Sequence, residues 1–340
     1  MSDEQMTLTE LSEPEGKVSE KGGNSGRDSI HPFLPDTDFT PNDVDAIADG
    51  DLAATAPTIE GGRPSHVLSF VIRGDWGHFR RIDRTVTKQT YRIIPKTTLA
   101  GLCAAIVGAP RDSYYEVFAP DHSAVAIAPI GELRTITMSS LGVWTNMDER
   151  QRRAGASPQS HSTTVRWPNT TTDRQRHPYE YLVSPAYRID LAVEDRAFYR
   201  TLAARLASKT SHYCPSLGLS ELLASIESLG EYPVEEIDRS AGPTDIYSVV
   251  GDGIEQAIPT KGQSYHVERT PHAMTTDEGG RTTDSFVDYA YTMTPTDESP
   301  TETQRWTGTI DAPLTAPVRI ANPGPTDQYG MIDGRPVAFL

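Results

Sequence analysis

An eight-residue segment, GDWGHFRR from Gly74 to Arg81, gathers the side-chain types that proteins use to hold single-stranded RNA. Arginines form forked hydrogen bonds to phosphates, exposed aromatic rings stack on unpaired bases for about 1–3 kcal/mol each, and glycines let the backbone approach a ligand closely. A turn in which Trp76 and Phe79 pack inward is the alternative, because large aromatic side chains are usually buried. The candidate RNA-binding residues here are Gly74, Trp76, Gly77, His78, Phe79, Arg80 and Arg81.

Basic character continues from this segment toward a predicted helix. The residues of this basic stretch are Arg84, Lys88, Tyr91, Arg92 and Lys96. Free backbone N–H groups at the start of a helix favour anions, so a lysine there strengthens the prediction of an anion-binding surface. A solvated charged loop is the alternative, although the single acid Asp83 offsets little of the positive charge.

A second basic cluster lies in the polar stretch 147–176, which we predict to be a projecting loop or hairpin. Its members are Arg150, Arg152, Arg153, Arg166, Trp167, Arg174 and Arg176. An exposed arm with this composition would reach a nucleic-acid backbone, and an ordinary surface loop explains the composition equally well.

The distribution of charge separates this central region from its flanks. The 340 residues include 31 basic and 47 acidic side chains, and the net charge of -16 taken alone disfavours a polyphosphate partner. Residues 1–62 carry -11 and residues 211–340 carry -13, whereas residues 63–210 carry +8. The sequence therefore predicts a basic functional surface inside an acidic shell.

The acidic excess has a second interpretation, because only six of the basic residues are lysine. This balance resembles that of proteins from salt-loving archaea. In near-molar salt the Debye length falls to about 3 Å, so contact hydrogen bonds and stacking would have to dominate RNA binding.

The order of predicted elements indicates an α+β fold. Residues 1–62 are polar and acidic and predict a disordered extension. Strands are predicted at His66–Arg73, Ser123–Ile130, Leu133–Trp144 and Tyr179–Val193, and helices at Pro95–Gly108, Asp195–Ser208 and Ser220–Leu229. This series matches a ferredoxin-like βαββαβ core at 63–230, the layout of RNA-recognition modules, with the arm as an insertion at about 147–176. Residues 231–340 predict a smaller β-rich region.

Signatures of several enzyme classes are missing from the sequence. There is no phosphate-binding loop, no H-E-x-x-H, no G-x-S-x-G and no C-x-x-C, and Cys103 and Cys214 fit no metal-ligand spacing. We therefore predict no catalytic residue, metal, cofactor or small-molecule substrate. Metal-independent RNA cleavage would need groups such as His78, Tyr91, Lys96 or His177 to meet at a 2′-hydroxyl, and the spacing does not bring them together. The longest apolar stretch, 99–109, is too short to span a membrane, which predicts a cytoplasmic protein.

Two regions of the sequence, 70–108 and 213–222, resemble the Cas family-five proteins of type I CRISPR systems. FVIRGDWGHFRR and TYRIIPKTTLAGLCAAIVG resemble the family's strand followed by Gly-x-x-x-x-Phe-Arg and its helix with Gly-Leu-x-x-x-Ile-x-Gly. The matching residues are Gly74, Phe79, Arg80, Pro95, Thr97, Gly101, Leu102, Ile106 and Gly108. The segment Tyr213–Leu222 resembles the family's Tyr-x-x-x-Leu-Gly motif after the second helix.

The resemblance implies a repeat-associated RNA-binding protein (the RAMP superfamily) with a ferredoxin-like core and a projecting thumb, placed in the Cascade surveillance complex. It would hold the 5′ handle of the crRNA without cutting it, beside the repeated backbone subunit and the large PAM-sensing subunit. The composition indicates subtype I-B. The first alternative is a processing endoribonuclease as in subtype I-C, whose catalytic residues include a tyrosine and a Lys-His pair. Tyr91 would stand for the tyrosine, and Arg176-His177 is an imperfect substitute for the pair. The second alternative is an assembly factor that contacts only proteins.

Overall fold

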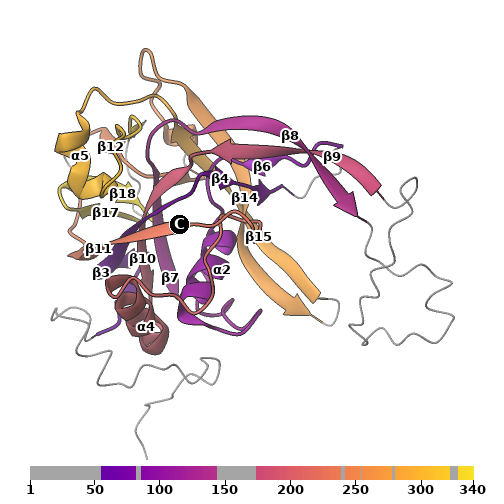
Figure 1. The fold of residues 1–340 in the computed structure, drawn as a ribbon. Coiled ribbons are helices and arrows are strands. Elements are labelled where there is room, and N and C mark those ends of the chain that lie inside the picture. Colours follow the sequence, from indigo (N-terminus) through magenta and orange to yellow (C-terminus); the bar gives the residue numbers. More distant parts are fainter. Residues whose placement is uncertain are drawn as a thin grey trace, which may run out of the picture.

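The computed structural model describes residues 55–81, 86–143, 174–238, 242–252, 254–277, 280–321 and 328–340. Most of the predicted disordered extension at 1–62 and of the predicted arm at 147–176 lies outside these ranges, and only residues 55–62 and 174–176 of them are described. Residues 174–176 form the start of a strand. The described part is a mixed α/β fold built mostly from antiparallel strands (Figure 1).

A four-stranded antiparallel sheet forms the centre of the molecule (Figure 1). In spatial order its strands are β11 (Ser225–Pro233), β3 (His66–Arg73), β10 (Ala186–Val193) and β7 (Ser123–Pro129). The middle strands β3 and β10 are buried almost throughout, and both are rich in apolar residues, although β10 also contains Arg188 and Asp190. The predicted strand His66–Arg73 is confirmed, and the strand predicted at Ser123–Ile130 ends one residue earlier.

Two helices, α2 (Lys96–Val107) and α4 (Arg196–Ala207), cover one face of this sheet (Figure 1). α2 ends at Gly108, whose φ of 92° is the left-handed conformation that glycine adopts without strain. α4 begins where the Asp195 side chain accepts a hydrogen bond from the backbone N–H of Phe198. Local signals of this kind predicted both helices, and both predictions are confirmed.

The opposite face of the sheet is covered by the C-terminal part of the chain. The covering elements are α5 (Pro300–Thr307), β17 (Tyr329–Ile332) and β18 (Arg335–Ala338), grouped at the left of Figure 1. Trp306, Val337 and Phe339 pack there against Val67 and Val71 of β3. RNA-recognition modules stack bases on the exposed face of their sheet. That route is closed on this sheet, because helices lie on one side and the C-terminal residues on the other.

A buried ion pair lies beneath this C-terminal cover. Arg188 and Asp190, both on β10, are 0% and 1% exposed, and Arg188 Nη2 lies 2.8 Å from Asp190 Oδ1. The Ser69 hydroxyl donates a hydrogen bond to the same carboxylate at 2.5 Å. The Arg188 guanidinium lies 3.9 Å from the centre of the Trp306 ring. The pair therefore joins β3, β10 and α5.

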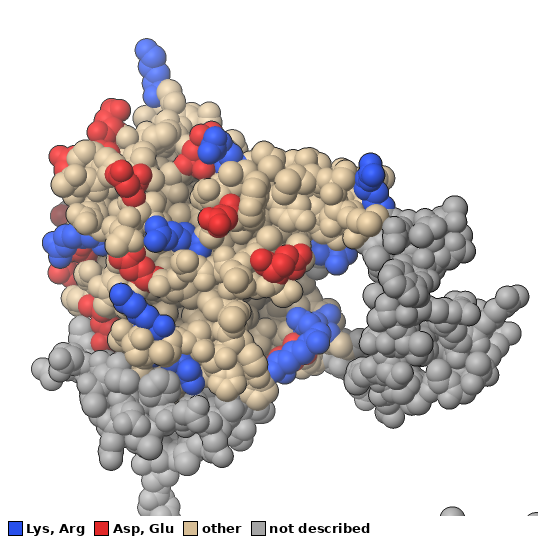
Figure 2. All heavy atoms as spheres, viewed as in Figure 1, with Lys and Arg blue, Asp and Glu red and all other residues tan. Residues whose placement is uncertain are grey.

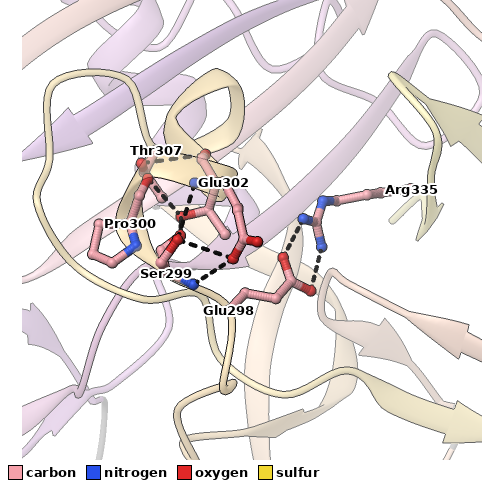
Figure 3. A network of polar contacts seen from close by, with 7 residues as sticks. Glu298, Ser299, Pro300, Glu302, Thr307 and Arg335 are labelled. Carbon is pink, nitrogen blue, oxygen red and sulfur yellow. Dashed lines mark hydrogen bonds and ion pairs between the residues drawn. The ribbon is translucent and has the colours of Figure 1, made fainter.

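The start of α5 is held by a polar network that Figure 3 shows from close by. The Ser299 side chain accepts from the backbone N–H of Glu302, and the Glu302 carboxylate accepts from that of Ser299, which is a capping box. Next to it, Arg335 of β18 donates to both oxygens of Glu298 at 3.2 and 2.5 Å. This network ties α5 to β18.

A second antiparallel sheet projects from the core at the right of Figure 1. Its order is β4 (Trp76–Gly77), β9 (Arg174–Val183) and β8 (Arg134–Val143). The single strand predicted at Tyr179–Val193 is wrong, because a turn at Ser184, with φ of 48°, divides it into β9 and β10. The strand predicted at Leu133–Trp144 corresponds to β8.

Two further predictions require correction. The helix predicted at Ser220–Leu229 is wrong, because residues 225–233 form the edge strand β11, paired with β3 along its length. Its bulge between Ser228 and Gly230 and its terminal Pro233 suit an edge strand and not a helix. The predicted disorder of residues 1–62 is also wrong for the last residues of that range, because β1 (Ile59–Glu60) pairs with β2 (Arg63–Pro64).

The remaining elements are mostly short strands and one long hairpin. They are β5 (Phe79–Arg80), β6 (Thr90–Tyr91), β12 (Thr244–Ile246), β13 (Val250–Gly251), a 3-10 helix (Ile254–Gln256), β14 (Tyr265–Asp277), β15 (Gly280–Thr292) and β16 (Val318–Ile320). Residues 231–340 are rich in strands, and α5 was not predicted. Val249, Tyr289 and Tyr291 lie in the same apolar cluster as α2, so this region shares the central core.

Candidate nucleic-acid interface

The glycines of the Gly74–Arg81 loop are explained by packing within the protein. A Cβ added at Gly74 would lie 2.8 Å from Leu217 Cδ1 and 2.9 Å from the Leu223 carbonyl oxygen. A Cβ at Gly77 would lie 3.1 Å from Pro185 Cγ. The close approach that these glycines allow is therefore to the segment 215–223 and to the turn before β10.

This contact joins the two segments that carry the family resemblance. Leu217 is fully buried, and its carbonyl oxygen accepts a hydrogen bond from the His78 backbone N–H at 2.9 Å. Gly218 has a φ of 98°, and a Cβ there would lie only 1.9 Å from the His78 carbonyl oxygen. The pair Leu217-Gly218 is thus the point where the Gly74–Arg81 loop packs against the segment 215–223.

Four of the candidate RNA-binding side chains are buried and do not line the surface. Phe79 and His78 are each 1% exposed, Tyr91 is 6% exposed and Lys96 is 0% exposed. Phe79 packs against Tyr187 with ring centres 6.1 Å apart. Burial lowers the pKa of His78, whose Nδ1 lies 2.7 Å from the Glu180 carbonyl oxygen. These buried side chains stabilise the conformation of the loop. For Phe79, the alternative in which the aromatic side chain packs inward is therefore correct.

The exposed or partly exposed side chains of the first cluster are three arginines, a lysine and a tryptophan. Arg80 is exposed, while Arg81, Lys88, Arg92 and Trp76 are partly exposed. The Arg81 guanidinium lies 5.5 Å from the centre of the Tyr91 ring. These four cations lie on or beside the paired strands Phe79–Arg80 and Thr90–Tyr91, and we call them the Arg80 strip (Arg80, Arg81, Lys88 and Arg92).

A buried acid fixes the strip to the C-terminal hairpin. Glu268 of β14 accepts hydrogen bonds from the backbone N–H groups of Arg92 at 2.9 Å and Ile93 at 3.3 Å. Its Oε1 lies 3.8 Å from Arg92 Nη1. Burial raises the pKa of Glu268. No pattern in the sequence pointed to Glu268, because its partners are far away in the chain.

The remaining candidates lie outside the described residues. They are Arg84, Arg150, Arg152, Arg153, Arg166 and Trp167. Arg174 begins β9 and Arg176 is exposed on the same strand. Two tyrosines of β9, Tyr179 and Tyr181, were not singled out from the sequence, and both are partly exposed beside His78. Their alternation along one strand was the signal available.

Lys96 is enclosed at the start of α2. Its Nζ donates to the backbone oxygens of Leu340 at 3.0 Å and Ser123 at 3.3 Å, and burial lowers its pKa from 10.5 to about 7. The predicted role as a surface anion contact at the helix start is therefore wrong, because the ammonium group points into the fold.

The burial of Lys96 predicts a pH dependence of stability. Between pH 7 and about 10 the unfolded chain holds the Lys96 proton and the folded chain does not, so rising pH stabilises the fold by at most about 1.4 kcal/mol per unit. Relative to Lys96→Met, the free energy of unfolding of the wild type should therefore rise over this range. Urea unfolding across that range measures the difference. The exposed control Lys261→Met should run parallel to the wild type, and a parallel Lys96→Met curve would contradict the argument.

Among the described residues, no three His, Cys, Asp or Glu side chains come together as a metal site. The described helices include none that is long and apolar enough to cross a membrane. Cys103 is buried and Cys214 is exposed, and neither forms a disulfide.

Comparison with known proteins decides the family. The family model described as "CRISPR-associated protein (Cas_Cas5)" matches residues 67–289, which is well over half of the chain. The chain belongs to the Cas5 family. The matched residues of this Cas5 protein contain the Arg80 strip, the segment 215–223 and the central sheet. No curated protein matches the sequence.

Several solved structures match the chain at low sequence identity and low TM-score. A chain of a "CRISPR RNA-guided surveillance complex" has 12% identity and a TM-score of 0.40, with 66% of this Cas5 protein and 89% of that chain covered. A CRISPR protein from Archaeoglobus fulgidus has 12% identity and a TM-score of 0.41, covering 81% and 98%. A chain of a type III-B Cmr-beta complex bound to cognate target RNA has 9% identity and a TM-score of 0.37, covering 66% and 84%.

Proposed function

We propose that this chain is an RNA-binding subunit of a CRISPR effector complex of the Cascade type, where it holds the 5′ handle of the crRNA. The observation that carries the proposal is membership of the Cas5 family over residues 67–289. The Arg80 strip lies within that range, and its guanidinium groups suit phosphate oxygens. Its neighbours would be the backbone subunit and the large PAM-sensing subunit, in a cytoplasmic complex.

The finer classification rests on topology and composition. The sequence order β3, α2, β7, β10, α4, β11 and the spatial order β11-β3-β10-β7 support a ferredoxin-like core with βαββαβ order. The excess of acid over lysine supports a haloarchaeal source and subtype I-B. In concentrated salt, direct contacts of the Arg80 strip would contribute more than long-range attraction.

We propose further that the chain does not cut RNA. Cleavage without metal needs an accessible acid and base at a 2′-hydroxyl. Tyr91, the counterpart of the nuclease tyrosine, is 6% exposed and lies under Arg81. His177 lies on β9 opposite Ser140, on the projecting sheet. The burial of Tyr91 favours a holding role over the endoribonuclease alternative.

Replacing Arg80 by alanine tests the proposed function. Loss of a charged hydrogen bond to phosphate should weaken crRNA retention in the assembled complex about 10- to 100-fold. Gel quantification of crRNA that copurifies with the tagged subunit measures it. Arg111→Ala is the matched control, since Arg111 has 77% of its side chain exposed and follows the opposite end of α2.

Three results would oppose the proposed function. Unchanged retention with Arg80→Ala would remove the Arg80 strip as the site. A defined product from repeat RNA incubated with the purified protein and a chelator would favour the nuclease. A complex that survives ribonuclease treatment, with no crosslink from this chain to RNA, would favour the protein-only assembly factor.

A further inference from the structure

One face of the projecting β4–β9–β8 sheet carries a row of aromatic side chains. Residues that lie opposite each other in antiparallel strands share a face, and alternate residues of one strand do so as well. Tyr181 lies opposite Ile136, and Tyr179 lies opposite Met138. Trp76 of β4 lies opposite Val183 and therefore joins the same side. We call this side the tyrosine face.

The rings on the tyrosine face are held in a fixed arrangement. The rings of Tyr179 and Tyr181 have centres 6.1 Å apart and lie within 28° of parallel. The buried His78 ring contacts both, with centres 5.3 and 5.8 Å away. Because a carbonyl oxygen only accepts, His78 Nδ1 donates to the Glu180 oxygen, which fixes the imidazole next to the two tyrosines. Trp76 packs edge-on to Tyr181 with ring centres 6.4 Å apart. Because these rings are already held in place, a ligand that contacts them would lose little affinity to the ordering of side chains.

The tyrosine face is open to solvent and has cations at its edges. Ile136 and Met138 are each 39% exposed. Lys88 forms a parallel bridge with Tyr179, so its side chain lies on this face, and Arg134 opposite Val183 is 65% exposed. On the side drawn in Figure 2, the projecting part of β8 and β9 has few charged side chains. Burial raises the pKa of Tyr181, and the negative charge of Glu221 raises it further.

We propose that the tyrosine face stacks successive unpaired bases of single-stranded RNA. This inference rests on the proposed function and assigns the bases of the bound strand to a second site beside the Arg80 strip. Two near-parallel rings repeated along a strand match how single-stranded nucleic acid is held, and cations on the same face can meet its phosphates. The central sheet has no open face for this task, and the projecting sheet has one.

The tyrosine face is continuous with the Arg80 strip. β5, which contains Arg80, follows β4 after a single residue, and the Lys88 backbone bonds to β9 through Pro178 and Glu180 at 2.8 and 2.9 Å. One strand can therefore place its phosphates along Arg80 and Lys88 while its bases lie on Tyr179 and Tyr181. A protein partner would not require cations beside the rings, which favours RNA as the occupant.

The test compares RNA binding by the full chain and its tyrosine variants. The probe is a fluorescent single-stranded RNA of about ten nucleotides from the repeat, with a matched strand that has abasic sites. The double variant Tyr179→Ala/Tyr181→Ala should bind about 10- to 100-fold more weakly. Tyr179→Phe/Tyr181→Phe, which keeps both rings, should bind within about threefold of the wild type. Phe286→Ala, which removes a 47% exposed ring from β15, is the matched control and should bind normally.

Two further measurements do not depend on the alanine variant being stable. The affinity of the wild-type protein for RNA should fall by a similar factor when the abasic strand replaces the normal one. In about 1 M salt, where the Debye length is about 3 Å, the loss caused by the tyrosine double variant should persist, and the loss caused by Arg80→Ala should shrink. This difference separates base stacking from attraction to phosphate.

The outcomes distinguish this inference from the proposed function. If Arg80→Ala weakens binding while the tyrosine variant and the abasic strand bind normally, the tyrosine face is wrong and the proposed function stands. If the tyrosine variant binds RNA normally but no longer enters the complex, the face docks a protein and the inference is overturned. If neither the wild-type chain nor its assembled complex binds RNA, both fail.

Discussion

Replacing Gly218 by alanine should lower the free energy of unfolding by at least about 4 kcal/mol, the range of the most severe single substitutions. The backbone there has a φ of 98°, which an L side chain rarely adopts. The added Cβ would also lie 1.9 Å from the His78 carbonyl oxygen, so the 215–223 segment must separate from the first loop. Urea unfolding followed by circular dichroism measures the loss, or the variant fails to accumulate as soluble protein.

Gly262→Ala separates the two causes. Its φ of 86° is similar, but nothing lies within 4 Å of the added Cβ. The free energy of unfolding of Gly262→Ala should therefore fall only by the cost of the backbone strain, about 1–2 kcal/mol. Similar losses in the two variants would show that contact with His78 contributes nothing, and the docking of the two family segments would lose its physical basis.

How much of the fold the sequence predicts depends on whether the signal is local. The helix from Lys96 to Val107 is bounded by Pro95 and Gly108, and the helix after Asp195 begins at its own cap, so both could be predicted. Residues 225–233 were mistaken for a helix because the pairing with β3 that makes them a strand comes from a distant part of the chain.

The candidate site shows the same limit more sharply. Composition located the first loop, but it could not show that Phe79 and Lys96 point inward while Arg80 points outward. Tyr179 and Tyr181 alternate visibly in the sequence, yet only the pairing of β9 with β8 and β4 shows which residues share their face. Residue types identify a kind of chemistry, and burial decides which members can perform it.

The closed central sheet limits where the proposed RNA ligand could bind. In a bare RNA-recognition module, ring stacking uses the main sheet. Here Trp306 and Phe339 occupy that surface, so a ligand is left with the loops and the projecting sheet. The negative flanks strengthen this argument, because the net charge of -13 over residues 211–340 leaves few places there where phosphates are attracted.

The second large effect is expected at the buried pair under Trp306. Asp190→Ala should destabilise the protein by about 3–5 kcal/mol, because it leaves the Arg188 charge buried without a counter-ion. Arg188 also contacts the Arg305 carbonyl oxygen at 3.3 Å, the Ser69 hydroxyl at 3.2 Å and the rings of Trp306 and Tyr232, and none of these groups carries a negative charge. Urea unfolding measures the loss.

Removing both charges should recover most of that stability. In Arg188→Met/Asp190→Val the methionine can still lie against Trp306, and no ion remains to be desolvated, so the double variant should be more stable than Asp190→Ala alone. The exposed pair Arg63–Glu236, 2.7 Å apart with Glu236 79% exposed, is the control, and Glu236→Ala should cost at most about 1 kcal/mol. Salt of about 1 M should reduce the exposed pair's contribution and leave the buried pair's unchanged. If Asp190→Ala costs no more than Glu236→Ala, water reaches Arg188, and the C-terminal cover does not seal the face of the central sheet.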